Sequence, residues 1–155
     1  MKRTTIVKTL LIVVASALVV GMVPGTQAVD KGCTNASLKG TFGYTNTGSI
    51  IAPAPDAGPF AGVGTQTFDG RGGTTATATV SQNGNIFAVT ITGTYSVNPD
   101  CTGTLELLIS PAGIPSFKGH AFFVIDNKGA EIRAINTDPG AVVTTVARRH
   151  FAPAD

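Results

Sequence analysis

The chain has 155 residues, of which 43% are hydrophobic and 13% are charged, and its formal net charge is +2. Three basic residues (Lys2, Arg3 and Lys8) and no acidic ones lie in the first 28 positions, so the remainder carries eight basic and nine acidic residues and a net charge of −1. A balance so close to neutral argues against a nucleic-acid surface and against a surface for anionic membranes.

The first 28 residues have the pattern of a secretory signal peptide. A basic start, MKRTTIVK, precedes an apolar run of 11 residues (LLIVVASALVV), and small residues precede a cleavage site after Ala28. The alternative is a membrane anchor, but a span needs about 20 apolar residues. We therefore expect residues 1–28 to be a signal peptide and residues 29–155 to be one secreted or periplasmic domain with no membrane anchor after cleavage.

The rest of the chain predicts β-structure throughout, because it is rich in Thr and Gly and has no sustained helical period. Alternating or apolar segments are separated by turn sequences such as DGRGG, QNGN, NPDC, DNKGA and TDPGA. The eight predicted strands are residues 37–46, 60–69, 73–82, 85–97, 102–110, 119–126, 131–137 and 141–151.

Turn chemistry predicts the strand register. Asn83-Gly84 is typical of a two-residue hairpin loop, and this loop would place Val80 opposite Phe87 and Ala78 opposite Val89. Three-residue loops at 70–72 and 99–101 would continue the same apolar face into the neighbouring strands. A shift of one residue would exchange the two faces, so the agreement between apolar partners supports this register.

Eight sequential antiparallel strands with one apolar face predict an all-β fold, an eight-stranded antiparallel up-and-down β-barrel, which leaves no exposed sheet edge. A two-sheet β-sandwich is the alternative, because short connections alone do not exclude it.

The two cysteines test this topology. In such a barrel the turn that holds Cys101 lies at the same end as the start of the first strand, where Cys33 lies. We therefore predict a Cys33–Cys101 disulfide, which suits an exported protein, and the alternative is two free thiols.

The two long connections, residues 47–59 and 111–118, would both lie at the opposite end of the barrel. They contain five prolines, which restrict their backbones. Long loops on a rigid scaffold often carry binding sites, although plain surface loops are an equal alternative.

One polar cluster is a candidate site. If Pro139-Gly140 forms a two-residue loop, several charged residues share one face, and we expect this face to continue to Phe123 on the strand at residues 119–126. An apolar lumen with these groups could bind an anionic amphiphile or support acid–base chemistry. The alternative, a cross-strand ion pair on the outer wall, is favoured because charges are rarely buried. The ligand-binding candidates are Glu131, Arg133, Arg148, His150 and Phe123.

No catalytic or cofactor motif accompanies this cluster. The sequence has no nucleophile elbow, no HExxH, no CxxC and no phosphate-binding glycine loop. Its two histidines are too few for a convincing metal site. We therefore predict no catalytic residue, no metal and no cofactor. Asn35-Ala36-Ser37 is an acceptor sequence for N-glycosylation in a host that glycosylates.

The segments CTNASLKGTFGYTNTG, AGVGTQTFDGRGG, GTYSVNPDCTGTLEL and EIRAINTDPGAVVTT resemble a group of small secreted bacterial proteins of uncharacterised function. These look like barrels of the allene-oxide-cyclase or lipocalin-like kind. The resemblance implies an eight-stranded barrel and carries over no active-site residue. Lipocalins have a Gly-x-Trp near the first strand, and here Gly40-Thr41-Phe42 is similar in spacing only.

The sequence thus predicts a non-enzymatic secreted barrel that holds a small apolar or amphipathic ligand. Small residues on the predicted inner face leave room for one. A cyclase- or isomerase-like enzyme that uses the lumen is one alternative, and an extracellular structural or adhesive module is the other. We expect no nucleic-acid partner, and the sequence does not indicate an oligomeric state.

Overall fold

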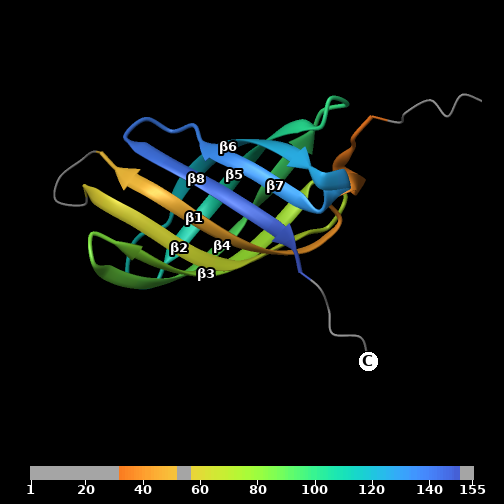
Figure 1. The fold of residues 1–155 in the computed structure, drawn as a ribbon. Coiled ribbons are helices and arrows are strands. Elements are labelled where there is room, and N and C mark those ends of the chain that lie inside the picture. The colour runs from red at the N-terminus through yellow and green to blue at the C-terminus, as the bar shows by residue number, and fades with distance from the viewer. Residues whose placement is uncertain (1–31, 52–56, 151–155) are drawn as a thin grey trace, which may run out of the picture.

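The computed structural model describes residues 32–51 and 57–150, and these form a closed antiparallel β-barrel of eight strands (Figure 1). Each strand pairs with the next along the chain, and the last pairs with the first, so the fold is the predicted up-and-down barrel and the sandwich alternative is wrong. The strands are β1 (Gly40–Ile50), β2 (Gly58–Phe68), β3 (Gly73–Gln82), β4 (Asn85–Val97), β5 (Thr102–Pro111), β6 (Phe117–Asp126), β7 (Glu131–Asn136) and β8 (Ala141–Arg149).

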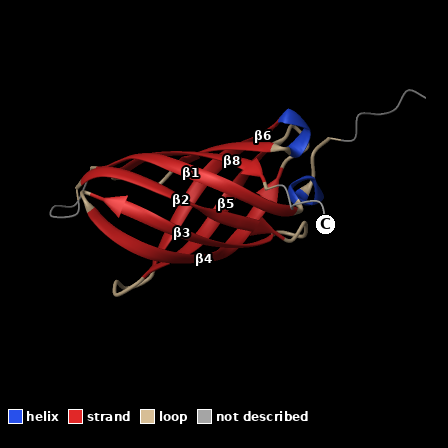
Figure 2. Cartoon of the chain, turned by 60° about the horizontal axis from the view of Figure 1, so that its bottom comes forward, coloured by secondary structure: helices blue, strands red, loops and turns tan. Residues whose placement is uncertain are grey.

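Two short 3-10 helices, η1 (Asn35–Leu38) and η2 (Asn127–Gly129), complete the described residues. Figure 2 shows both of them at the same end of the barrel. Neither these nor any other described segment forms a helix long and apolar enough to cross a membrane. The predicted signal peptide, residues 1–28, lies outside the described residues.

The predicted register is confirmed at the turns that fixed it. Val80 pairs with Phe87 and Ala78 with Val89 across the Asn83-Gly84 turn. Both residues of this turn have positive φ, at 49° and 86°, as a primed turn requires. The apolar face of β3 and β4 therefore points into the barrel, and the threonines between its residues point outward.

The predicted limits of the first strand are wrong by several residues. Residues 35–38 form η1 instead of extended chain, so β1 begins at Gly40. At its other end β1 continues to Ile50, because residues 47–50 pair with both β2 and β8. The β1–β2 connection is correspondingly short, at residues 51–57, and the β5–β6 connection covers residues 112–116.

One end of the barrel, which we call the closed end, is filled by aromatic side chains. The ring of Phe68 meets those of Phe42 and Tyr95 edge to face, with centroids 5.5 and 5.0 Å apart. Leu38 of η1 and Phe123 of β6 are also almost completely buried here. Edge-to-face pairs of this kind add stability beyond the burial of their surface.

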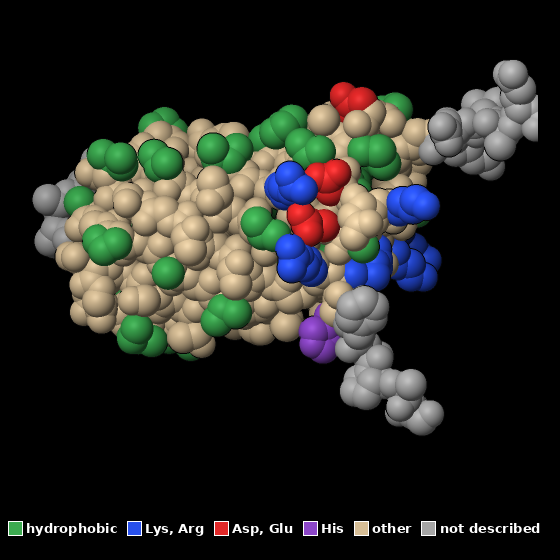
Figure 3. All heavy atoms as spheres, viewed as in Figure 1, with side chains coloured by type: hydrophobic (Ala, Val, Ile, Leu, Met, Phe, Trp, Pro, Cys, Tyr) green, Lys and Arg blue, Asp and Glu red, His purple; other side chains and the backbone are tan. Residues whose placement is uncertain are grey.

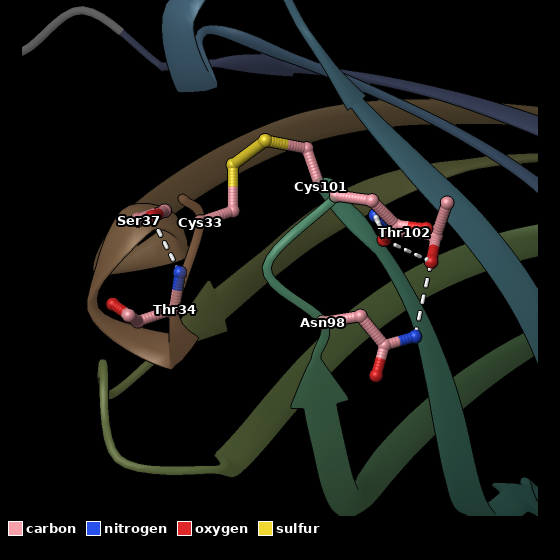
Figure 4. Close-up of a disulfide and its surroundings, with 7 residues drawn as sticks. Cys33, Thr34, Ser37, Asn98, Cys101 and Thr102 are labelled. Carbon is pink, nitrogen blue, oxygen red and sulfur yellow. Dashed lines mark hydrogen bonds between the residues drawn. A yellow bond between two sulfur atoms is a disulfide. The ribbon is translucent and has the colours of Figure 1, made fainter. Parts of the chain in front are cut away.

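The disulfide ties the start of the described chain to this end (Figure 4). Cys33, just before η1, is bonded to Cys101 in the β4–β5 turn, as predicted. Cys101 has a φ of 67°, an unfavourable value for a residue with a side chain, at the third position of a three-residue loop where glycine is usual. The bridge therefore requires a cysteine at a position that the turn alone would give to glycine.

Hydrogen bonds from η1 continue this attachment. The Asn35 side chain accepts a bond from the Val97 N–H (2.8 Å) and donates one to the Arg71 carbonyl (3.4 Å). The Tyr95 hydroxyl donates to the Asn35 carbonyl and accepts from the Gly70 N–H, both at 3.0 Å. Asn35, which the sequence marked as a glycosylation acceptor, thus has a side chain that is used to hold η1 on the barrel.

Arg149 seals the closed end from β8. Its guanidinium donates to the carbonyls of Lys39 (2.7 Å), Gly129 (2.9 Å) and Ser37 (3.4 Å) and lies 4.7 Å from the centroid of the Phe42 ring. One cation therefore satisfies three carbonyl groups from η2, η1 and the segment that leads into β1.

Candidate functional site in the barrel lumen

A cavity of about 780 Å³ occupies the rest of the lumen. It ends at the aromatic layer of the closed end and reaches the opposite end, which we call the mouth. The mouth carries the β1–β2, β3–β4, β5–β6 and β7–β8 connections, and the cavity is lined there by Asn83, Ile114, Pro139 and Gly140. A volume of this size falls within the range of about 300–1,000 Å³ that is usual for small-molecule sites.

The cavity has two chemically different walls. On β4 and β5 the lining side chains are almost all apolar: Phe87, Val89, Ile91, Leu105, Leu107 and Ile109. Across the lumen, β1, β7 and β8 contribute uncharged polar groups among their apolar ones, namely Tyr44, Asn46, Asn136 and Thr145. Asn46 and Thr145 are direct partners in the β1–β8 pairing, and Tyr44 is the neighbouring inward residue on β1, so Tyr44, Asn46 and Thr145 form one polar patch.

Two polar atoms of this patch are left without partners. Among the described residues, neither the Tyr44 hydroxyl oxygen nor the Asn46 Oδ1 has a hydrogen-bond partner, although both atoms are buried. Tyr44 is only 6% exposed, and burial raises the pKa of its hydroxyl. Tyr44 thus presents a neutral phenol next to the aromatic layer. An unpaired buried polar group costs about 1–3 kcal/mol, so these two atoms require an explanation.

Another polar side chain on the inner face, Gln66, does have a hydrogen-bond partner within the barrel. Gln66 on β2 donates from Nε2 to the Thr74 hydroxyl (3.1 Å), which donates in turn to the Thr67 carbonyl (2.9 Å). The unpaired groups on β1 are therefore not a general property of polar side chains on the inner face.

Part of the space beside the small residues of the inner face is filled by side chains of neighbouring strands. A Cβ atom at Gly62 would collide with Asn46 Oδ1 and would lie 2.8 Å from Val80 Cγ1, and one at Gly103 would collide with the ring of Phe123. Side chains of neighbouring strands occupy the space beside these glycines. Phe123, a predicted ligand-binding residue, is therefore part of the closed-end core.

Acidic and basic residues line the cavity at its mouth. Among the described lining residues these are Lys118, His120 and Asp138. Asp138 accepts bonds from the His120 backbone N–H (2.7 Å), the His120 ring (2.6 Å) and the Asn136 amide (3.0 Å). Partial burial opposes its ionisation, but these bonds outweigh that effect and lower the pKa of Asp138. The Asp138 carboxylate also accepts from the His120 backbone N–H, which lies beyond the last residue pair between β6 and β7.

The predicted charged cluster is on the outer wall. The Pro139-Gly140 register is confirmed, since Glu131 pairs with Arg148 and Arg133 with Val146. However, Arg133 also pairs with Val124, not with Phe123, so matching this face with Phe123 was wrong. The side chains of Arg133 and Arg148 are 65% and 76% exposed.

These charges form a surface ion-pair network. Glu131 bonds to Arg133 Nε and Arg148 Nε, each at 3.0 Å, and these two hydrogen bonds lower the pKa of Glu131. Arg133 also meets Asp126 at 3.1 Å. Figure 3 shows acidic and basic side chains gathered near the closed end on this otherwise uncharged face. His150 follows β8 at the closed end and is exposed, so none of the four charged candidates reaches the lumen.

Sequence reasoning missed the polar patch on β1. The signal was present, because Phe42, Tyr44 and Asn46 alternate on one strand face and Asn46 is polar on a face that is otherwise apolar. Both polar residues lay within the strand predicted at residues 37–46, but the sequence alone does not show which polar atoms of an inner face lack a partner.

No protein-family model, curated protein or solved structure matches this chain. Within residues 32–51 and 57–150, no group of three or more His, Cys, Asp or Glu side chains could hold a metal ion.

Proposed function

We propose that this protein binds one small apolar or amphipathic molecule inside the barrel, in an oxidising compartment outside the cytoplasm. The observation that carries this proposal is the cavity of about 780 Å³, which has an apolar wall on β4 and β5 and reaches the mouth of the barrel. Apolar surface that faces such a space gains free energy when a ligand of matching character displaces water from it.

The distribution of packing supports a binding role. The closed end has a complete aromatic core, a disulfide and a sealing arginine, so the chain can fill its own lumen where stability requires it. The mouth half has the same strands but keeps its inner side chains apart. A rigid end that supports an unfilled half is the arrangement of a preorganised site, which lowers the entropic cost of binding.

The compartment is inferred from the disulfide and from the signal-peptide pattern of residues 1–28. Disulfides persist in oxidising environments such as the periplasm or the extracellular space. The Cys33–Cys101 bridge and that pattern together favour secretion or the periplasm as the place where the barrel works.

The alternatives have less support. An adhesive or structural module would be expected to have a filled barrel, and the cavity argues against it. An isomerase-like enzyme was expected to use Glu131, Arg133 or His150, and these residues lie outside the lumen. Neither alternative has an observation of its own in its favour.

The test is to fill the lumen from two opposite walls. Ala78 on β3 and Ala134 on β7 both line the cavity, and the adjacent residues Thr79 and Ile135 are exposed on the outside. The Ala78→Trp/Ala134→Trp protein should lose binding of methylpyrene, a fluorescent apolar probe, because the two indoles occupy its space. The Thr79→Trp/Ile135→Trp protein adds the same side chains outside and should bind the probe as the native protein does.

Circular dichroism of both double variants would establish that the barrel is retained. The chain has no tryptophan of its own, so the emission of the added indoles reports whether they lie in an apolar lumen or in water. Absence of saturable probe binding by the native protein, or equal binding by both variants, would refute the proposal. A native mass spectrum of protein from its own secretion route would then identify a retained ligand as a mass lost on denaturation.

A further inference from the structure

We infer that the ligand of the lumen is an uncharged molecule with an apolar body and a hydroxyl group, and that Tyr44 and Asn46 bind this hydroxyl at the inner end of the cavity. This inference rests on the proposed function and specifies the ligand. It assigns a binding role to two residues that are otherwise unexplained by the packing of the barrel.

The position of the two residues sets the depth of the polar contact. Tyr44 pairs with Gly64 and Ala147, one step along β1 from Phe42 of the closed-end core, and Asn46 is the next inward residue toward the mouth. Both side chains line the cavity, but the Tyr44 hydroxyl and Asn46 Oδ1 are themselves buried in the unliganded barrel, so binding requires these two side chains to turn toward the lumen. A ligand that reaches them therefore lies along the lumen, with its polar group at the inner end of the cavity and its body against the apolar wall of β4 and β5.

Hydrogen-bond capacity indicates which group fits there. The Tyr44 hydroxyl can donate one bond and accept another, and Asn46 Oδ1 can only accept. Within the described residues neither atom has a partner. A ligand hydroxyl is complementary to both, because it can accept from Tyr44 and donate to Asn46. A ketone or ether could pair with Tyr44 alone and would leave the Asn46 oxygen unsatisfied.

Charge excludes an acid or an amine at this depth. The acidic and basic side chains among the described lining residues, Lys118, His120 and Asp138, lie at the mouth. Arg149 of the closed end does not line the cavity and is already bonded to three carbonyls. An ion at the inner end of the cavity would thus be buried without a counter-charge, which is far more costly than burying a hydroxyl.

The experiment compares three probes that differ in one group: pyrenemethanol, methylpyrene and pyrenecarboxylate. Tyr44→Phe should weaken pyrenemethanol binding about three- to tenfold, the usual range for one hydrogen bond between neutral groups. It should leave methylpyrene binding unchanged or slightly tighter. Asn46→Leu should give the same selective loss, and the native protein should bind pyrenecarboxylate more weakly than the alcohol.

The chain provides a matched control, because it has two tyrosines. Tyr95→Phe removes the same atom from a hydroxyl that is bonded at the closed end, so it should leave the affinities of all three probes unchanged. It should lower the urea midpoint of the unliganded protein, whereas Tyr44→Phe should not lower it, because the Tyr44 hydroxyl has no partner among the described residues.

The outcomes separate this inference from the proposed function. If methylpyrene binds in the lumen and Tyr44→Phe and Asn46→Leu leave pyrenemethanol affinity unchanged, the lumen binds ligands but the inferred hydroxyl contact is wrong. Binding of pyrenecarboxylate as tight as that of the alcohol would refute the uncharged class. If no probe binds the native lumen, both proposals fail together.

Discussion

The two tyrosines of this chain summarise the difference between the two halves of the barrel. Tyr95 at the closed end packs edge to face against Phe68, and its hydroxyl both donates and accepts a hydrogen bond. Tyr44, one layer toward the mouth, is equally buried, but among the described residues its hydroxyl has no partner. The same side chain is thus a completed structural contact in one half and an available binding group in the other.

Stability and binding capacity are thus separated along the barrel axis. Burial of apolar surface and satisfaction of polar groups are concentrated where η1, the disulfide and Arg149 meet. The mouth half depends on its closed hydrogen-bonded sheet, which holds the walls apart without filling them. Binding therefore need not compete with the contacts that keep the protein folded.

The largest expected difference is between two phenylalanines on the inner face of β2. Phe68→Ala should destabilise the protein by about 3–5 kcal/mol, because it opens a hole in a core that is otherwise filled. Phe60→Ala, near the mouth, should cost well under half as much, because that half-buried side chain already borders the cavity. Urea unfolding followed by circular dichroism measures both. Equal losses would contradict the division into a packed half and an unfilled half.

The second effect is loss of the disulfide. The bridge joins residues separated by 68 positions. In the chain-entropy model, the Cys33→Ser/Cys101→Ser protein should lose at most about 4 kcal/mol of stability. Methylpyrene affinity, measured under conditions where the variant remains folded, should not change, because neither cysteine lines the cavity. A large loss of affinity would show that the closed end controls the shape of the lumen.

The smallest effect concerns acid stability. The Asp69 carboxylate accepts bonds from the N–H groups of Arg71 (2.7 Å), Gly73 (2.9 Å) and Gly72 (3.0 Å), and these bonds lower its pKa in the folded protein. Its contribution to stability is therefore present above the unfolded-state pKa of about 3.9 and is lost as the pH falls through the lower folded-state value. Asp69→Asn should reduce the fall in urea midpoint between neutral pH and acid.

Asp138 provides the counterpart at the mouth, since its pKa is also lowered. Asp138→Asn should likewise flatten the pH dependence, and it should in addition weaken methylpyrene binding, because Asp138 lines the cavity and orders its edge through His120. Asp69→Asn should leave the probe affinity as it is. If methylpyrene affinity changed in the Asp69 variant and not in the Asp138 variant, the assignment of the binding cavity to the mouth would be wrong.

The sequence alone predicted the barrel and the Cys33–Cys101 disulfide. Strand register depends on local turn chemistry and on a two-residue period, both of which can be read from Asn83-Gly84 and its flanking residues. Four strands lie between the two cysteines, and each antiparallel strand reverses the direction of the chain. Cys101 therefore lies at the same end of the barrel as Cys33. These features are local or follow from counting, so they need no knowledge of side-chain packing.

The lumen was decided only by the tertiary structure. Glu131, Arg133 and Arg148 were correctly placed on one face, but which face pointed inward depended on their pairing with β6. Whether inner residues fill the barrel depends on how side chains from several strands meet, as when Phe123 lies over Gly103. The same holds for the Tyr44 hydroxyl, because the partners that a polar atom finds or lacks are set by strands distant in sequence.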